Sequence, residues 1–506
     1  LALLRIVVLK MLPFDNKSEL QVVVDLPEGT PLETTQALLA DIAAEVSRVP
    51  EVVNCQGYAG TSAPVNFNGL VRQYFLRSGS TVGDLQVNLA DRHHRDRQSH
   101  AIARELRIAL QPLAARYAAS VKVVEVPPGP PVLAPVVAEV YGPDPARSRQ
   151  VALALAQVFH DTPGLVDIDT SVEADGPRER LVIDRVRAAR LGVAIPDIVT
   201  ALTTGVAGLD AAWLQDGRSR SPRPVRLRVG AAEQASLPAL LALRVRAASG
   251  ALVPLADLLV VEGDTWDGVI QHKDLLPVVY VTGDEAGAFD SPLYGMFGVV
   301  ARVGREELAG ERLAQHFISQ PVDTAGYAVK WDGEWQITYE TFRDMGIAYA
   351  AGILLIYFLV VAQFRSYRVP LIIMAPIPLT LIGVMPGHAL LGAQFTATSM
   401  IGMIALAGII VRNSILLVDF INHALAGGRD ASSAVIEACA VRAKPIVLTA
   451  AAAMLGALFI LDDPIFNGLA VALISGILVS TALTLLVIPL LYFSHVRRHG
   501  PGAGAD

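Results

Sequence analysis

The sequence predicts a membrane-embedded α-helical domain joined to an α+β domain outside the membrane. Its 506 residues are 53 % hydrophobic and only 18 % charged, a balance too apolar for a wholly soluble protein of this size. The apolar excess is also uneven: residues up to about 335 have an ordinary soluble composition, whereas the remainder holds long runs almost free of charge. Because the net charge is only -7 and no extended basic stripe occurs, nucleic acid is not an expected partner.

The membrane domain is predicted from five apolar segments in succession. Each has roughly 17 to 27 residues, close to the ~20 that a helix needs to cross a ~30 Å hydrocarbon core. The alternative is a set of buried helices in a soluble protein, which five such runs in a row do not favour. The segments are residues 345–362, 371–391, 399–420, 445–461 and 467–493.

The orientation of these segments follows from the positive charges around them. Lys and Arg gather in alternate connectors and after the last segment, whereas the connectors 392–398 and 462–466 contain neither. Since positive connectors stay in the cytoplasm, we expect the other connectors and the whole α+β domain in the periplasm. The positive residues are Arg365, Arg368, Arg429, Arg442, Lys444, Arg497 and Arg498.

The last apolar segment carries small residues at intervals of four. Small side chains along one face let helix backbones approach closely inside lipid. We therefore expect a second helix or another subunit to pack there, the alternative being chance in a chain rich in small residues. The stripe consists of Gly468, Ala472, Gly476, Ser480 and Thr484.

Arg412, near the middle of the third apolar segment, is the main candidate for chemistry within the membrane. A guanidinium at this depth costs several kcal/mol unless it is paired or hydrated. Asp419 lies seven residues further along, about 10 Å along the helix axis, which is too far for an ion pair. The five segments hold no acid at the depth of Arg412, so its partner is expected from elsewhere. The alternative is a structural arginine bonded to backbone carbonyls.

Arg442 and Thr449 form a second candidate pair. They are seven residues apart and therefore share one face of a helix. Pro445 lies between them and suits the first turn of a helix, where its missing N–H is harmless. The alternative for Arg442 is an ordinary positive anchor at the cytoplasmic surface.

The α+β domain alternates strands with amphipathic helices and repeats its pattern after the Pro- and Gly-rich residues 127–131. Two such units predict split βαβ, ferredoxin-like layers, the second one interrupted by an insertion at 178–261 with an exposed arm at 215–223. In the first unit we expect strands at 20–26, 52–56, 70–76 and 121–126, and helices at 31–49, capped by Thr30, and 98–118. In the second unit we expect strands at 136–141, 166–170, 269–272, 277–283 and 327–331, a helix at 145–160 and a helix ending near 319.

The sequence contains no enzyme signature. It has no glycine-rich phosphate loop, no His/Cys cluster with metal-ligand spacing and no nucleophile elbow. Cys55 and Cys439 fall on opposite sides of the membrane and therefore cannot form a disulfide. We expect neither an enzyme nor a metal site.

Four motifs together resemble the resistance–nodulation–cell division (RND) superfamily, in its hydrophobe/amphiphile efflux (acriflavine-resistance) branch. The resemblance covers essentially the whole chain and corresponds to the C-terminal half of such a permease. The motifs occur in the family's order and spacing: Met11-Leu-Pro-Phe-Asp15, Leu26-Pro-Glu-Gly-Thr30, Arg412-Asn-Ser-Ile-Leu-Leu-Val-Asp-Phe-Ile421 and Lys444-Pro-Ile-Val-Leu-Thr449.

The resemblance implies a domain organisation. It comprises the end of a truncated membrane helix (1–12, family helix 7), a first porter subdomain (13–130), a second porter subdomain (131–177 and 262–340), an inserted docking subdomain (178–261), a transmembrane domain (341–498, family helices 8–12) and a cytoplasmic tail (499–506).

The resemblance also implies a function: proton-driven export of amphiphilic small molecules across the bacterial inner membrane, with no cofactor besides the proton motive force. The implied partners are the missing N-terminal half, two further copies in a homotrimer, a periplasmic adaptor and an outer-membrane channel. Arg412, Asn413, Arg442 and Thr449 fall at proton-coupling positions. Arg412 replaces a usual lysine, so it is a fixed countercharge to paired aspartates of helix four that this chain does not contain.

In the family the substrate passes through a cleft of the porter subdomains. Our candidates for its lining are Tyr58, Phe67, Tyr74 and Phe75, since aromatic rings stack on amphiphiles without strict geometry. The alternative for these residues is strand packing. For the chain as a whole, the alternatives are a truncated, non-transporting structural subunit without the helix-four aspartates, and a protein-translocation accessory of the same superfamily.

Overall fold

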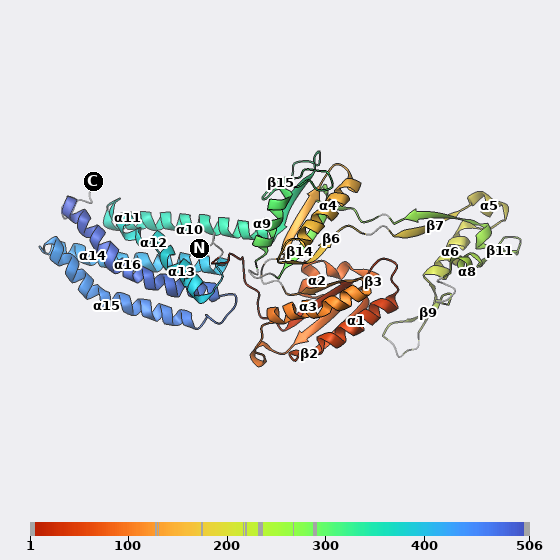
Figure 1. The fold of residues 1–506 in the computed structure, drawn as a ribbon, viewed down its shortest axis with the longest axis horizontal. Coiled ribbons are helices and arrows are strands. Elements are labelled where there is room, and N and C mark those ends of the chain that lie inside the picture. Colours follow the sequence, from red (N-terminus) through yellow and green to blue (C-terminus); the bar gives the residue numbers. More distant parts are fainter. Residues whose placement is uncertain are drawn as a thin grey trace. The chain divides into compact units, whose positions relative to one another are not determined.

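The computed structural model describes residues 6–126, 129, 131–173, 176–215, 217, 220–230, 236–266, 268–286 and 291–499. The chain divides into two units (Figure 1). Unit 1 consists of Leu1–Val172 and Ile270–Asp506, and unit 2 of Glu173–Val269. Unit 1 holds the membrane helices and two α+β subdomains, here named subdomain A (residues 19–124) and subdomain B (residues 136–172 and 271–333).

Subdomain A is an antiparallel sheet with α1 and α3 packed on one face (Figure 1). Its elements are β1 Glu19–Asp25, α1 Leu32–Val46, β2 Val52–Thr61, α2 Phe67–Val71, the 3-10 helix η1 Tyr74–Leu76, β3 Ser78–Leu89, the 3-10 helix η2 Arg92–His94, α3 Ser99–Tyr117 and β4 Ser120–Val124. The strand order is β2-β3-β1-β4, and α1 and α3 connect the strands in a β-α-β-β-α-β sequence. Alternate residues of β1, such as Leu20, Val22 and Val24, fill the core below the helices.

Two details predicted for subdomain A are wrong. Residues 70–76, expected to be a strand, form the end of α2 and the whole of η1. The Asn66 side chain caps α2 by accepting a hydrogen bond from the Gly69 N–H at 2.7 Å, which starts a helical turn where the apolar run favoured a strand. Thr30 does not cap α1, because its hydroxyl donates to the Pro27 carbonyl at 2.6 Å.

Subdomain B is a second sheet, with α4 and α9 sharing its core. Its elements are β5 Val136–Tyr141, α4 Pro145–His160, β6 Leu165–Thr170, β13 Gln271–Lys273, β14 Leu276–Glu285, α9 Pro292–Val303, β15 Ala314–His316 and β16 Ala328–Gly333. The strand order is β13-β14-β5-β16-β15, and β6 also pairs with β14. The ranges predicted for β5 and α4 are confirmed. The helix expected to reach residue 319 ends at Val303, with Gly304 at its C-cap, and the chain then turns at Ala309 and Gly310, which take left-handed φ values of 51° and 78°.

Unit 2 has its own core and begins and ends with the strands of one two-stranded ribbon, β7 and β12. Its elements are β7 Pro177–Ile183, α5 Arg185–Arg190, α6 Ile195–Val206, β8 Leu209–Leu214, β9 Arg223–Leu227, α8 Leu237–Leu241, β10 Arg244–Arg246, β11 Leu252–Pro254, the 3-10 helix η3 Leu255–Asp257 and β12 Leu259–Thr265. The predicted arm at 215–223 joins β8 to β9, a hairpin exposed along both strands. Residues 216, 218 and 219 of that arm lie outside the described residues.

The described chain contains five helical spans long and apolar enough to cross a membrane, and each overlaps one predicted segment. Their helices are α10 Glu334–Phe364, α11 Val369–Met374, α12 Pro376–Leu379, α13 Leu381–Leu391, α14 Ala397–Ala426, α15 Ala431–Leu458 and α16 Asn467–His499. Helices α11 to α13 form one span, broken near Pro376 and Thr380. Helix α10 follows directly on β16, so one continuous 31-residue helix leaves subdomain B and enters the membrane domain.

The expected start of the fourth span at Pro445 is wrong. Helix α15 begins at Ala431, where the Asp430 side chain caps it by accepting from the Ser433 N–H at 3.1 Å. Pro445 therefore lies inside the helix, and Arg442 and Lys444 belong to the helix rather than to a connector. The Thr449 hydroxyl donates to the Pro445 and Ile446 carbonyls at 3.1 and 2.9 Å, so this side chain is bonded within its own helix.

The small residues of α16 face two neighbouring helices. A Cβ on Gly476 would lie 2.3 Å from Leu406 of α14 and 3.2 Å from Val384 of α13. On the other side of the contact, a Cβ on Gly402 of α14 would come within 2.9 Å of the Ala472 Cβ. Ser480 and Thr484 are also buried. The backbones of α13, α14 and α16 thus approach as closely as small residues permit.

Residues 6–12, expected to end a membrane helix, are not helical; residues 1–5 lie outside the described part. Residues 6–18, here named the strap, bond to the corner before α14 through Lys10 N to Phe395 O and Phe395 N to Val8 O, at 3.2 and 2.8 Å. The strap also reaches α9, because the Ser291 hydroxyl donates to Leu9 O at 2.7 Å. The strap therefore connects the membrane helices to subdomain B by hydrogen bonds.

Gly383 tests this close packing of helices. A Cβ there would lie 2.7 Å from the Ser475 carbonyl oxygen and 2.8 Å from the Val479 Cβ, atoms that cannot move without shifting α16. We expect Gly383→Ala to destabilise the purified protein by about 1–3 kcal/mol, seen as a lower thermal unfolding midpoint. Gly456→Ala is the control, since no described heavy atom lies within 4 Å of its added Cβ. Equal midpoints for the two variants would contradict the packing described.

Candidate functional sites in the periplasmic cleft and the membrane

A cavity of about 770 Å³ lies between subdomains A and B. This volume suits a drug-sized molecule and far exceeds that of a single ion. Tyr74 and Tyr280 are the aromatic residues in its described wall. Apolar residues such as Val71, Leu133 and Ile337 form part of the wall, and ionisable side chains of both signs form another part: Arg72, Arg77, Lys122, Glu139, Asp167, Asp169, His272, Lys273, Asp284 and Asp332.

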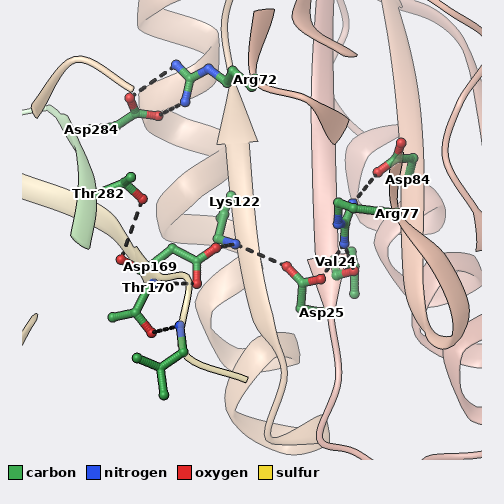
Figure 2. Close-up of polar contacts among 11 residues, drawn as sticks. Val24, Asp25, Arg72, Arg77, Asp84, Lys122, Asp169, Thr170, Thr282 and Asp284 are labelled. Atoms are coloured by element: carbon green, nitrogen blue, oxygen red, sulfur yellow. Dashed lines mark hydrogen bonds and ion pairs between the residues drawn. The ribbon is translucent and has the colours of Figure 1, made fainter. Parts of the chain in front are cut away.

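Within the described residues, three ion pairs join subdomain A to subdomain B. Arg72, which follows α2, makes a two-pronged pair with Asp284 of β14 at 3.0 and 3.1 Å, and the two side chains are only 9 % and 8 % exposed (Figure 2). The Arg107 Nε of α3 donates to Asp167 of β6 at 2.9 Å. Lys122 of β4 pairs with Asp169 of β6 (Figure 2). The guanidinium–carboxylate pairs have the geometry that gives strong, directional binding.

The contact between Lys122 and Asp169 continues into subdomain A as a chain of alternating charges (Figure 2). Lys122 Nζ also lies 3.0 Å from Asp25, and Asp25 pairs with Arg77. Arg77 in turn bonds to the fully buried Asp84 at 2.8 Å. Each buried charge therefore has a neighbour of opposite sign, as burial demands.

Local backbone geometry places the carboxylates of subdomain B. Asp167 has a left-handed φ of 52°, which is unfavourable for a residue other than glycine. The pairing of β6 with β14 also shifts register between Thr282 and Asp284. Such irregularities re-aim side chains at the edge of a sheet. Here they leave Asp167 and Asp284 facing Arg107 and Arg72.

Burial and neighbouring charges act on these groups in opposite directions. Burial by itself lowers the pKa of Lys122, but Asp169 and Asp25 raise that pKa well above its usual range. Burial raises the pKa of Asp25, but its cationic neighbours lower it by more. For Asp167, burial prevails and keeps its pKa above the ordinary value in spite of Arg107. Lys122 and Asp25 are consequently held in their charged forms.

A further charge cluster belongs to subdomain B alone. Lys273 pairs with Glu139 and with Asp332, the latter at 2.5 Å. Glu139 is fully buried and also accepts from the Tyr141 hydroxyl at 2.8 Å. Burial is the largest influence on Glu139 and raises its pKa. This cluster is part of the cavity wall and keeps it polar.

Of the four aromatic residues expected to line the substrate cleft, Tyr74 lies in the cavity wall. Phe67 and Phe75 are exposed outside it, and Tyr58 lies on β2, where its hydroxyl donates to Gln56. A role in substrate binding stays a prediction for all four. The charged residues of the cavity wall were not predicted from the sequence. Their ion pairs join residues that are far apart in the chain, such as Arg72 and Asp284.

Arg412 lies on an exposed stripe of α14 together with Ile401, Ala405, Gly408 and Leu416. No ion pair or hydrogen bond of Arg412 occurs within the described part of the chain. A Cβ on Gly408 would meet no heavy atom within 4 Å, so the small residues beside Arg412 leave room for a neighbouring helix. The α14 face that carries Arg412 is therefore unpartnered in the described structure.

The other proposed proton-coupling residues lie at different positions. Asn413 is buried, on a different face of α14 from Arg412. Arg442 stacks over the Phe420 ring at 5.3 Å, which puts it about 12 Å from the depth of Arg412 towards the cytoplasm. Thr449 is about 10 Å back along the antiparallel α15, close to the depth of Arg412. The structure thus brings Arg412 and Thr449 to one level and separates Arg442 from them.

Metal ligands are sparse in the described structure. Among the described residues, no group of three or more His, Cys, Asp or Glu side chains could hold a metal ion. The cavity wall contains neither cysteine nor methionine among its described residues. Cys55 and Cys439 are both free.

The sequence and the fold are similar to those of known proteins. The chain is 27 % identical over 375 residues to the cobalt-zinc-cadmium resistance protein CzcA of Cupriavidus metallidurans, which covers 71 % of this chain and 33 % of that protein. It is 32 % identical over 166 residues to the multidrug resistance protein MdtC of Serratia proteamaculans, covering 32 % of this chain and 16 % of that protein. The fold matches the crystal structure of a heavy metal efflux pump with a TM-score of 0.78 at 21 % identity, over 97 % of this chain and 49 % of that one.

The chain spans about a third of the length of CzcA and about half of the solved pump chain. Residues 1–495 match the AcrB/AcrD/AcrF family. Since this match covers nearly all 506 residues, the chain belongs to the AcrB/AcrD/AcrF family of the RND superfamily.

Proposed function

We propose that this chain forms part of a proton-coupled exporter in the bacterial inner membrane, and that the exporter carries amphiphilic organic molecules out through the cavity between subdomains A and B. The observation that carries the proposal is the combination of a drug-sized cavity outside the membrane with an unpaired guanidinium inside it. Subdomains A and B are then the porter subdomains, with ferredoxin-like layers, and unit 2 is the inserted docking subdomain. The working assembly is a trimer with a periplasmic adaptor and an outer-membrane channel.

Energy coupling would centre on Arg412. A guanidinium holds its proton at any working pH, so the titrating groups must be carboxylates on a helix packed against the exposed stripe of α14. Protonation of those carboxylates would remove the partner of Arg412 and let α14 shift. The N-terminal corner of α14 is bonded to the strap, and the strap to α9 of subdomain B. A shift of α14 would thereby reach subdomain B, which forms one side of the cavity.

The cavity favours organic substrates over metal ions. Soft and borderline metals select thiolate, thioether and imidazole ligands, and the described cavity wall offers a single imidazole, that of His272. Metal export is the second candidate, because CzcA and the solved relative are named as metal-resistance and metal-efflux proteins. Multidrug export has support of the same kind from MdtC.

Arg412 gives the first test of this proposal. In cells that express the complete transporter, we expect Arg412→Ala to raise the accumulation of an exported dye to the level of cells without the pump, because the countercharge is lost. Arg412→Lys keeps the charge and should retain export. Arg497→Ala, at the cytoplasmic end of α16, is the control for membrane insertion. Unchanged export by Arg412→Ala, at matched protein levels, would show that the arginine is only structural.

A second test separates organic substrates from metals. We expect expression of the transporter to lower the accumulation of amphiphilic fluorescent dyes and to leave growth in cobalt, zinc or cadmium salts unchanged. The Arg412→Ala transporter serves as the inactive control for both measurements. Increased metal tolerance without any change in dye accumulation would favour metal export instead.

A further inference from the structure

The charges that join subdomains A and B are segregated by sign. Within the described residues, every cation of the three joining pairs belongs to subdomain A and every carboxylate to subdomain B. The cations are Arg72, Arg107 and Lys122, and the carboxylates are Asp284, Asp167 and Asp169. A separation of the two subdomains would therefore free Arg72 and Lys122 on one side of the cavity and Asp167, Asp169 and Asp284 on the other, while Asp25 stays beside Lys122.

The two subdomains can move relative to each other as rigid bodies because they do not share an apolar core. Each has its own apolar core, one formed by β1, β3, α1 and α3 and the other by β5, β14, α4 and α9. Residues 125–135, which include the Pro- and Gly-rich run, link them along the chain. Contacts between bodies with separate cores permit relative motion unless the interface is large and apolar. Here the described side-chain bonds between the two subdomains are the three ion pairs, so their strength contributes to how firmly the cavity stays closed.

Two of the three pairs are too buried to be incidental surface contacts, whereas Asp169 of the third pair is 48 % exposed. Side chains of the pairs Arg72–Asp284 and Arg107–Asp167 are at most 11 % exposed. Removal of one partner of such a pair leaves an uncompensated buried charge, which is far more unfavourable than loss of an exposed pair. The walls can separate only if water or a ligand replaces these partners. A ligand that carries both signs can satisfy both walls at once.

We propose that the three ion pairs act as a latch between subdomains A and B, and that the cavity takes zwitterionic amphiphiles. The cationic group of such a ligand lies against Asp167, Asp169 and Asp284, and its anionic group against Arg72 and Lys122. This inference rests on the proposed function in that it names the substrate class of the same cavity. The latch itself, however, is a property of the two subdomains and needs no proton gradient.

Access to the cavity tests the latch. Thr282 lies in the cavity wall on β14, so a membrane-impermeant maleimide will react with the thiol of Thr282→Cys when the walls separate. The variant is made in the complete transporter without other cysteines, including Cys55→Ser and Cys439→Ser. We expect Asp284→Asn to speed this labelling at least about tenfold. Lys122→Met breaks a different pair and gives an independent reading with the same expected direction.

Two controls make the result specific to the latch. The exchange of charges in Arg72→Asp with Asp284→Arg should bring the labelling rate back towards that of the unchanged latch. Glu45→Gln removes the partner of Arg48, which is 75 % exposed on subdomain A, and should leave the rate unchanged. If Asp284→Asn and Lys122→Met are both labelled as slowly as the protein that carries Thr282→Cys alone, the latch is overturned.

Three ligands with the same hexyl chain test the substrate class. Calorimetric titration of the purified transporter compares a hexyl sulfobetaine with hexyltrimethylammonium and hexyl sulfate. A titration of each ligand into the same detergent without the transporter provides the blank for partition. We expect the sulfobetaine to bind at least about tenfold more tightly than either singly charged ligand. Equal or tighter binding of a singly charged ligand would overturn the zwitterion preference.

These outcomes are distinguishable from a failure of the proposed function. Labelling and calorimetry require neither export nor a proton gradient, so both can succeed in a protein that does not transport. Conversely, export of dyes with unchanged labelling in the latch variants would support the transporter and overturn the latch.

Discussion

A guanidinium cannot remain unpaired in hydrocarbon, and this requirement at Arg412 explains much of the membrane domain. The described helices carry no acid at its depth, and the small residues Ala405 and Gly408 hold the adjacent face open for a helix. By contrast, another side of α14 is packed closely against α16 through Gly402 and Ala472. One helix thus has a fixed face and an unpartnered face, and the unpartnered face bears the charge.

Outside the membrane the same electrostatic requirement is met differently. In the cavity wall the buried charges are neutralised by one another, through pairs such as Arg72–Asp284. The strap connects the two regions, since it bonds to Phe395 at the start of α14 and to Ser291 at the start of α9. The hydrogen bonds of the strap therefore join the start of α14 in the membrane domain to the start of α9 in subdomain B.

How much was predictable from the sequence depended on the range of the interactions involved. The membrane spans follow from length and hydropathy, and β5 and α4 from periodicity with a local cap at Asp144, all of which act over a few residues. Residues 70–76 were misread because capping by Asn66 overrides an apolar run that suits either structure. The ion pairs of the cavity were not predictable, because they join residues far apart in the sequence and on different sheets, such as Arg72 and Asp284. The lack of an acidic partner for Arg412, in contrast, was predictable from the sequence, because Arg412 lies inside an apolar segment and the five segments hold no acid at its depth.

The most direct test of this account is to identify what lies against the exposed stripe of α14. Gly408→Cys places a thiol one turn from Arg412, and a photoactivatable thiol reagent on the complete transporter can cross-link it to its neighbour, which mass spectrometry then identifies. The account predicts cross-links to a membrane helix with an Asp or Glu within one turn of the attachment point. Cross-links only to lipid, or to a helix without an acid at that level, would contradict it.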